Sequence, residues 1–146
     1  MRRAVAERVR LILAVLGAGI SVYLILVHYD SHVALACVES GIIDCVGVLT
    51  SPQSEWFHIP VAAFGLLWFV VAGTLAALAL RSPDRAALQT WGLIWVEIGA
   101  ATVVFLVYEE LIVIGRICMW CTLVHIIVLT SLVLAISSGG RAAPQP

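Results

Sequence analysis

The chain has 146 residues, of which 62% are hydrophobic and 12% are charged, and its mean hydropathy is +1.09. A soluble domain of this length needs far less apolar surface to fill one core, so the composition excludes an ordinary soluble protein and indicates a membrane protein. The formal net charge of -1 gives no reason to expect a nucleic-acid partner.

Four apolar stretches are long enough to cross a bilayer, which requires about 20 mostly apolar residues for a hydrocarbon core of about 30 Å. They predict helices over residues 11–29, 58–80, 86–108 and 117–137. We therefore expect an all-α membrane protein, with a single domain over residues 1–146 and a bundle of four transmembrane helices.

Arginine placement predicts the orientation of these helices, because positively charged flanks stay on the cytoplasmic side of a membrane. Only Arg116 lies on the outer side. The remaining arginines precede the first helix, separate the second from the third, or follow the fourth: Arg2, Arg3, Arg8, Arg10, Arg81, Arg85 and Arg141. Both termini are expected in the cytoplasm. A basic segment before an apolar run is also typical of a signal peptide, but the later apolar helices make its removal unnecessary.

The first outer loop, residues 30–57, contains the cysteine pair Cys37 and Cys45. Residues 42–51 are too apolar for a freely solvated loop, so we expect a short helix along the membrane surface, which Pro52 helps to end. The dipeptide Ile59-Pro60 is then expected to open the second helix, since proline is tolerated in a first turn.

Near the middle of the third helix lies Glu97. An ionised carboxylate is costly inside a membrane, and an ionisable residue there is by default a functional hypothesis. We expect Glu97 to be protonated and hydrogen-bonded across the bundle. The alternative is a proton relay, or the coupling carboxylate of a small four-helix transporter.

The fourth helix starts with the motif Cys118-x-x-Cys121. Only a thiolate attacks a disulfide, and both a helix N-terminus and the nearby Arg116 favour the thiolate form. The spacing places both sulfurs on one helix face, with His125 on the same face about 6 Å deeper. His125 is a candidate to donate a hydrogen bond or a proton to an electron acceptor. The tail, residues 138–146, is polar and is expected to be disordered.

All four cysteines lie at the outer end by this topology, in the compartment where disulfides persist. Two redox pairs at one membrane face indicate a relay, in which a soluble dithiol reduces the loop pair and the loop pair reduces the helix pair. The sequence has no haem, flavin or nucleotide signature, so a lipid-soluble quinone is the expected acceptor. A structural zinc site, for which Cys-x-x-Cys is a common half, and inert core cysteines are the alternatives; we expect no metal.

Three motifs follow one another along nearly the whole chain: Cys37-x7-Cys45-x5-Ser51, Ile59-Pro60-x3-Phe64-Gly65 and Cys118-x2-Cys121. Their order and spacing resemble the vitamin K epoxide reductase family. The resemblance implies a four-helix bundle around a quinone of the menaquinone, ubiquinone or vitamin K type, with the outer loop or its short helix capping the pocket.

The resemblance also implies a role for each cysteine. Cys37 would exchange with the partner, Cys45 would pass electrons to Cys118, and Cys121 would lie next to the quinone. Similar bacterial members oxidise a secreted or periplasmic thioredoxin-fold dithiol protein that supports disulfide formation. Some carry this domain fused at the C-terminus; this chain ends at Pro146 without it, so a separate partner is expected. The expected location is the bacterial cytoplasmic (inner) membrane, with the cysteines on the extracytoplasmic side.

The same resemblance places Ser51 beside the quinone or as a cap of the loop. Further candidates for the pocket wall are apolar: Leu49, Val61, Phe64, Trp68 and Leu129. The vertebrate branch uses an asparagine and a tyrosine where this chain has Val61 and His125, so epoxide reduction is not implied. The disulfide bond protein B family has the two cysteine pairs in the reverse order, which favours the first family over this rival.

Overall fold

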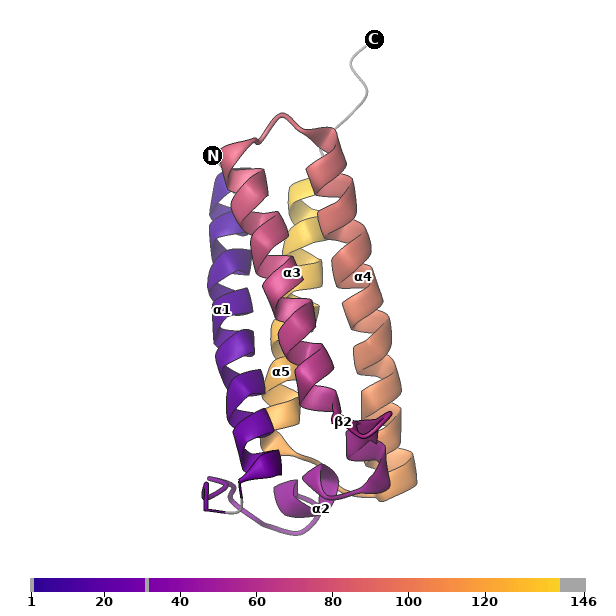
Figure 1. Ribbon diagram of the computed structural model, residues 1–146. Coiled ribbons are helices and arrows are strands. Elements are labelled where there is room, and N and C mark those ends of the chain that lie inside the picture. The colour runs from indigo at the N-terminus through magenta and orange to yellow at the C-terminus, as the bar shows by residue number, and fades with distance from the viewer. Residues whose placement is uncertain (1, 31, 140–146) are drawn as a thin grey trace.

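The computed structural model describes residues 2–30 and 32–139 of the protein. Figure 1 shows an elongated bundle of long helices that run side by side. The long helices are α1 (Arg2–Tyr29), α3 (Val61–Arg81), α4 (Ala86–Tyr108) and α5 (Met119–Gly139). Each is long and apolar enough to cross a membrane. The predicted all-α fold with four membrane helices is therefore confirmed. The tail was predicted to be disordered from residue 138; this is wrong for residues 138 and 139, which belong to α5, and residues 140–146 lie outside the described residues.

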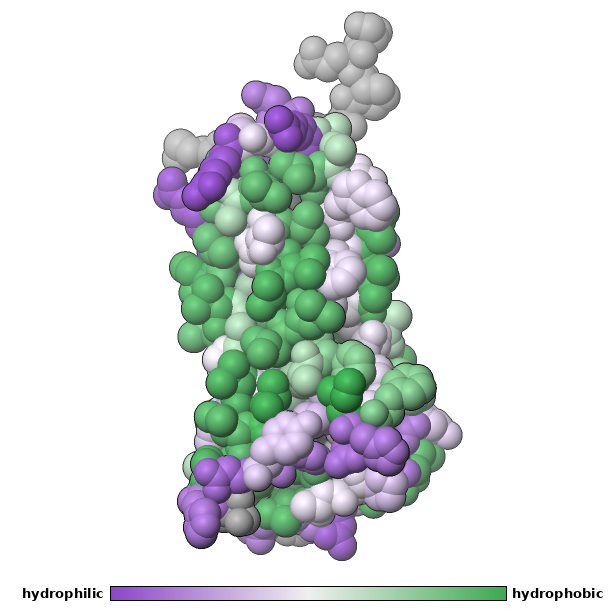
Figure 2. Space-filling view, viewed as in Figure 1, coloured by the Kyte–Doolittle hydropathy of each residue, from purple (hydrophilic) through white to green (hydrophobic). Residues whose placement is uncertain are grey.

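Apolar side chains cover the outside of the bundle. In Figure 2, hydrophobic residues form a broad band along the helices, and hydrophilic residues gather at the two ends. Large exposed hydrophobic side chains occur on every long helix, for example Leu16, Leu67, Val104 and Val133. Such a surface is unfavourable in water and favourable in a hydrocarbon core. The band is the surface that a bilayer would cover.

Glycines allow two of the helix contacts to be close. A Cβ atom built on Gly17 of α1 would lie 2.3 Å from the ring of Phe69 on α3, and one on Gly99 of α4 would lie 2.5 Å from the ring of Trp68. Phe69 is only 2% exposed and belongs to the main hydrophobic cluster. Small residues at these positions let neighbouring membrane helices approach closely.

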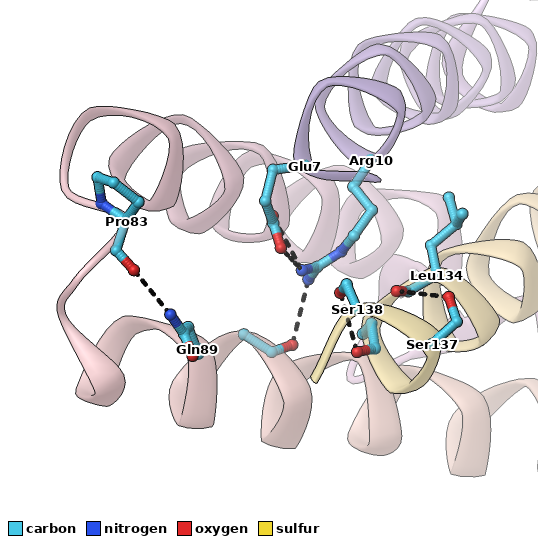
Figure 3. Close-up of polar contacts among 9 residues, drawn as sticks. Glu7, Arg10, Pro83, Gln89, Leu134, Ser137 and Ser138 are labelled. Atoms are coloured by element: carbon cyan, nitrogen blue, oxygen red, sulfur yellow. Dashed lines mark hydrogen bonds and ion pairs between the residues drawn. The ribbon is translucent and has the colours of Figure 1, made fainter. Parts of the chain in front are cut away.

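One end of the bundle, which we call the arginine end, contains the start of α1, the connection between α3 and α4, and the end of α5 (Figure 1). Figure 3 shows Arg10 paired with Glu7 at this end. The guanidinium donates to the Glu7 carboxylate at 2.9 Å and to the carbonyl of Gly92 on α4 at 3.3 Å. Both charged side chains are buried. Helix α1 therefore starts at Arg2 rather than at the predicted residue 11, because Arg10 is part of the helix packing and not a solvated flank.

The opposite end, which we call the cysteine end, is covered by the loop that follows α1 (Figure 1). This loop contains the short helix α2 (Cys45–Leu49), shorter than the predicted residues 42–51, and the 3-10 turn η1 (Pro52–Ser54). The Asp44 carboxylate caps α2 by accepting from the Gly47 N–H at 2.6 Å, as acidic side chains commonly do at a helix start.

A small antiparallel hairpin of β1 (Glu55–Trp56) and β2 (Ile59–Pro60) joins this loop to α3. Phe57 and His58 form its two-residue turn with positive φ angles of 55° and 63°, the backbone that hairpin turns of this length require. The prediction that α3 begins at residue 58 is wrong. Pro60 ends the hairpin as the residue before α3, because the hairpin keeps it extended.

Helix α4 continues into a π-helical turn, η2 (Glu109–Ile114), where a plain connection was predicted. Gly115, with a φ of 71°, ends the turn in the left-handed conformation that glycine adopts most readily. Its N–H and that of Arg116 both donate to the carbonyl of Glu110. The chain thereby reverses direction within a few residues and leads directly into α5, which begins at Met119.

Candidate active site

The four cysteines gather at the cysteine end of the bundle. Cys37 and Cys45 form a disulfide within the loop, with their Cα atoms 6.3 Å apart. Cys118 and Cys121 are free thiols at the start of α5. Cys45 and Cys118 are both 0% exposed and pack in one cluster, with Cys37 and Cys121 at its edge. The fold thus brings the two predicted pairs together, with one cysteine of each pair in the shared interior.

Backbone hydrogen bonds tie the segment before Cys45 to the segment before Cys118. The Asp44 N–H donates to the Ile117 carbonyl at 3.0 Å, and the Ile117 N–H donates to the Ile42 carbonyl at 2.9 Å. Arg116 forms an ion pair with the Asp44 carboxylate. Asp44 therefore caps α2 and anchors the loop to the start of α5, which sets the position of Cys45.

Cys118 is the better placed of the two free thiols to become a thiolate. A hydrogen bond from the Cys121 thiol lowers the pKa of Cys118 below its ordinary value, and burial opposes this shift. The backbone N–H of Cys121 also donates to the Cys118 sulfur at 3.3 Å. The sequence predicted that the helix start and Arg116 would favour the thiolate form. The Arg116 guanidinium pairs instead with Asp44, so the neighbouring cysteine is the main cause.

A cavity of about 290 Å³ lies between the four helices, beneath the loop. This is close to the lower limit for small-molecule sites. All five residues predicted for the quinone site line it: Leu49, Ser51, Val61, Phe64 and His125. Cys121 and Trp68 do so as well. Leu129 is 42% exposed on the outside of α5, so its predicted place in the wall is wrong.

The titratable groups of this cavity lie toward its cysteine end. His125 is 6% exposed and follows Cys121 by one helical turn, about 6 Å deeper. The Ser51 hydroxyl donates to the Val48 carbonyl at 2.7 Å, which ties it to α2, but its side chain makes no capping hydrogen bond to η1. Most other lining residues are apolar. An apolar slot with a thiol and an imidazole at one end suits a planar, weakly polar ring.

Sequence reasoning missed Glu110, which is 7% exposed and lines the same cavity. Its carboxyl faces the backbone N–H of Cys118 and the thiol of Cys121. It also missed His28, which lines the cavity from α1 and pairs with Glu55 of the hairpin at 3.1 Å. The available signal for Glu110 was an acidic pair in the connection that precedes the Cys-x-x-Cys motif. Both acidic residues line the cavity, but the pattern did not reveal that Glu110 is the buried one, because the π-helical turn decides it.

Glu97 lies outside this site. Its side chain is exposed on the outer surface of α4, and among residues 2–30 and 32–139 it takes part in none of the ion pairs. The expected hydrogen bond across the bundle is therefore wrong. The helix turns this position away from its neighbours.

The described residues do not support the alternative of a structural zinc site. Among the described residues, no group of three or more His, Cys, Asp or Glu side chains could hold a metal ion. Cys37 and Cys45 are bonded to each other rather than directed at a common centre with Cys118 and Cys121. The arrangement is that of one disulfide and one pair of free thiols.

The profile described as the vitamin K epoxide reductase family matches residues 8–136 of this chain. The chain belongs to the vitamin K epoxide reductase family. The match includes all four cysteines and nearly all of the four long helices. As a member of this family, the protein is a membrane oxidoreductase with a quinone-related redox function.

Proposed function

We propose that this protein is a thiol:quinone oxidoreductase of a bacterial cytoplasmic membrane that reoxidises a thioredoxin-fold dithiol protein and so supports disulfide formation. The main support is the arrangement of three cysteines. Cys45 and Cys118 are buried together, and Cys121 lies in the wall of the cavity. Two electrons can then pass from the loop to the helix and from the helix to a quinone.

Cys37 is the entry point for electrons in this proposal. It is half-buried and lies between the exposed residues Ala36 and Val38, whereas Cys45 is completely buried. A partner thiolate therefore attacks the Cys37 sulfur and breaks the Cys37–Cys45 bond. The second partner thiol then resolves the mixed disulfide, which leaves the loop pair reduced and the partner oxidised.

The next step transfers the electron pair to the helix. The Cys45 thiolate attacks Cys118 of an oxidised Cys118–Cys121 pair, and the Cys121 thiolate leaves. Cys37 then attacks Cys45, which restores the loop disulfide and frees Cys118. The resulting state, with a loop disulfide and two helix thiols, is the state that the structure describes.

The cavity suits the quinone that completes the cycle. Aromatic side chains of Phe64 and Trp68 form apolar walls, and Cys121 and His125 supply a thiol and an imidazole at one end. A bound quinone of the menaquinone, ubiquinone or vitamin K type would accept two electrons and two protons. The helix pair would return to its disulfide. Val61 and His125 differ from the vertebrate pattern, so epoxide reduction is not part of the proposal.

The proposed orientation places the arginine end in the cytoplasm and the cysteine end outside. Charged residues at the arginine end are mainly arginines of α1 and of the connection between α3 and α4. Positively charged flanks favour the cytoplasmic side. This orientation would expose Cys37 in the compartment where disulfides persist.

Turnover with a quinone tests the whole proposal. Purified protein is mixed with a reduced thioredoxin-fold protein and a short-chain menaquinone, and quinone reduction is followed by absorbance. We expect turnover in the wild type and almost none in Cys121→Ser. Glu97→Gln, a change outside the site on α4, serves as a control and should retain activity. Equal rates in the wild type and Cys121→Ser would contradict the proposed electron path.

A trapping experiment tests Cys37 separately. In Cys45→Ser, Cys37 is a free thiol that attacks the disulfide of an oxidised partner; the loop has no second thiol to resolve the resulting bond, so we expect a mixed disulfide to accumulate on a non-reducing gel. The matched variant Cys37→Ser should trap no partner at the loop. A mixed disulfide that forms equally in both variants would show that the partner enters elsewhere.

A further inference from the structure

Glu110 is a buried carboxyl that the cysteine relay leaves without a role. It is 7% exposed and lies in the π-helical turn η2. Its own carbonyl accepts the N–H groups of Gly115 and Arg116, so its backbone is fixed by the turn that leads into the Cys-x-x-Cys motif. Turns of this kind change the direction of side chains and are frequent at functional sites.

Two groups of the Cys-x-x-Cys motif lie beside the carboxyl of Glu110. It faces the backbone N–H of Cys118 and the thiol of Cys121. Three further titratable groups line the same cavity: His28, Glu109 and His125. The ion pairs formed within residues 2–30 and 32–139 do not include Glu110. A buried carboxylate without a cation is costly, and taking up a proton removes that cost, so the Glu110 carboxylate is a ready proton acceptor.

We propose that Glu110 accepts the proton of the Cys121 thiol when the helix pair is oxidised, and passes it to the quinone. This inference rests on the proposed function. In this step two S–H bonds break, the Cys118–Cys121 bond forms, and two electrons reduce the quinone. The Cys121 proton moves to Glu110 and then to a quinone oxygen. The Cys118 proton goes to water at the cysteine end, and the second quinone proton comes from water.

The geometry explains why a carboxyl is useful at this position. Cys121 and the quinone would share an apolar cavity, in which separated charges are poorly solvated. A carboxyl that lines the same cavity as the thiol lets the proton leave as the electrons leave. His125 lies one turn deeper on α5 and faces the same cavity, so it is suited to orient the ring rather than to receive the thiol proton.

The test measures a single turnover of pre-reduced protein with a short-chain menaquinone, which removes the partner from the experiment. Glu110→Gln keeps an oxygen that can accept from the Cys118 N–H but cannot take a proton. Loss of general acid–base catalysis typically costs about 10²- to 10⁴-fold, and we expect at least about a 10²-fold slower reaction in Glu110→Gln. Glu110→Asp should recover a substantial part of the rate, and Glu97→Gln should equal the wild type.

A pH series separates proton transfer from a structural role. In the wild type we expect the rate to fall at acidic pH as Glu110 becomes protonated, and in Glu110→Gln this dependence should disappear. The number of alkylatable thiols in each reduced variant, counted by mass spectrometry, verifies an intact loop disulfide and a free helix pair.

Three results would overturn the inference. A Glu110→Gln variant with the wild-type rate at every pH refutes proton transfer through Glu110. A slow variant that retains the wild-type pH profile shows a structural role instead. A wild-type protein that reduces no quinone removes the proposed function, and this inference with it.

Discussion

Asp44 and Arg116 form an ion pair that joins the loop before Cys45 to the segment before Cys118. Asp44 also caps α2 through the Gly47 N–H, so a single carboxylate supports both the cap helix and the junction between the two cysteine pairs. Exposed ion pairs contribute about 0.2–1 kcal/mol, whereas loss of a helix N-cap costs about 1 kcal/mol. The cap is therefore the larger of the two contributions.

Substitutions of Asp44 should separate these contributions. Asp44→Asn keeps a capping side chain and loses the charge, so we expect electron transfer from the loop to the helix pair to slow by no more than about threefold. Asp44→Ala loses both and should slow it by about tenfold. The measurement is the rate at which Cys118 and Cys121 become alkylatable after a reduced partner is added. A milder effect in Asp44→Ala than in Asp44→Asn would contradict this assignment.

The pKa of Cys118 should depend on Cys121. A hydrogen bond from the Cys121 thiol lowers the pKa of Cys118. The Cys118 thiolate should therefore form at a pH below 9.0, the ordinary pKa of a thiol. Cys121→Ala should move the ultraviolet thiolate absorbance to higher pH, and Cys121→Ser, which still has a donor, should lie between. An unchanged titration in Cys121→Ala would rule out the hydrogen bond as the main cause.

The same shift predicts a pH dependence of stability. A thiol whose pKa is lower in the folded protein stabilises the fold fully above its unfolded pKa, and this contribution is lost as the pH falls through the folded value. The difference in unfolding free energy between the wild type and Cys118→Ala should therefore grow from neutral to alkaline pH. Denaturant unfolding in detergent at two pH values checks the sign, and a difference that shrinks with rising pH would be inconsistent with it.

The contact between Gly17 and Phe69 should not accept a methyl group. In Gly17→Ala the new Cβ would lie 2.3 Å from a buried ring, and overpacking of this kind costs about 1–3 kcal/mol. Gly19→Ala is the matched control, because a Cβ there has no atom within 4 Å and improves helix propensity. Thermal unfolding in detergent should rank Gly17→Ala below the wild type and Gly19→Ala at or above it.

His125 should matter for the quinone and not for the partner. We expect His125→Ala to lower the rate of quinone reduction by about tenfold, since a lost hydrogen bond to a charged or polarised group costs about 1–2 kcal/mol. Formation of the Cys37 mixed disulfide should be unaffected. Leu129 lies one turn further along α5 but on its outer surface, so Leu129→Ala should leave both rates unchanged. Equal loss in the two variants would point to a helix defect instead.

Much of the fold follows from local features of the sequence. Four runs of apolar residues predict the helices because a bilayer core requires a minimum length of such residues, and their ends agree with the structure within a few residues except at the start of α1. The grouping of the cysteines into a loop pair and a helix pair follows from their positions, whereas the disulfide between Cys37 and Cys45 is known only from the structure. The boundaries that were wrong involve residues whose partners are distant in the chain: Arg10 with Gly92, and Pro60 with Glu55 in the hairpin.

The sequence by itself determined that the protein lies in a bilayer, that it has four long helices, and which cysteines are its redox groups. Hydropathy, helix length and residue chemistry are local properties. Only the tertiary structure decided which side chains meet. It buries Cys45 with Cys118, turns Glu110 toward Cys121 through a π-helical turn, and leaves Glu97 on the outer surface. Within a membrane helix, the direction of a side chain depends on helix rotation and backbone turns, and these are set by the packing of all four helices together.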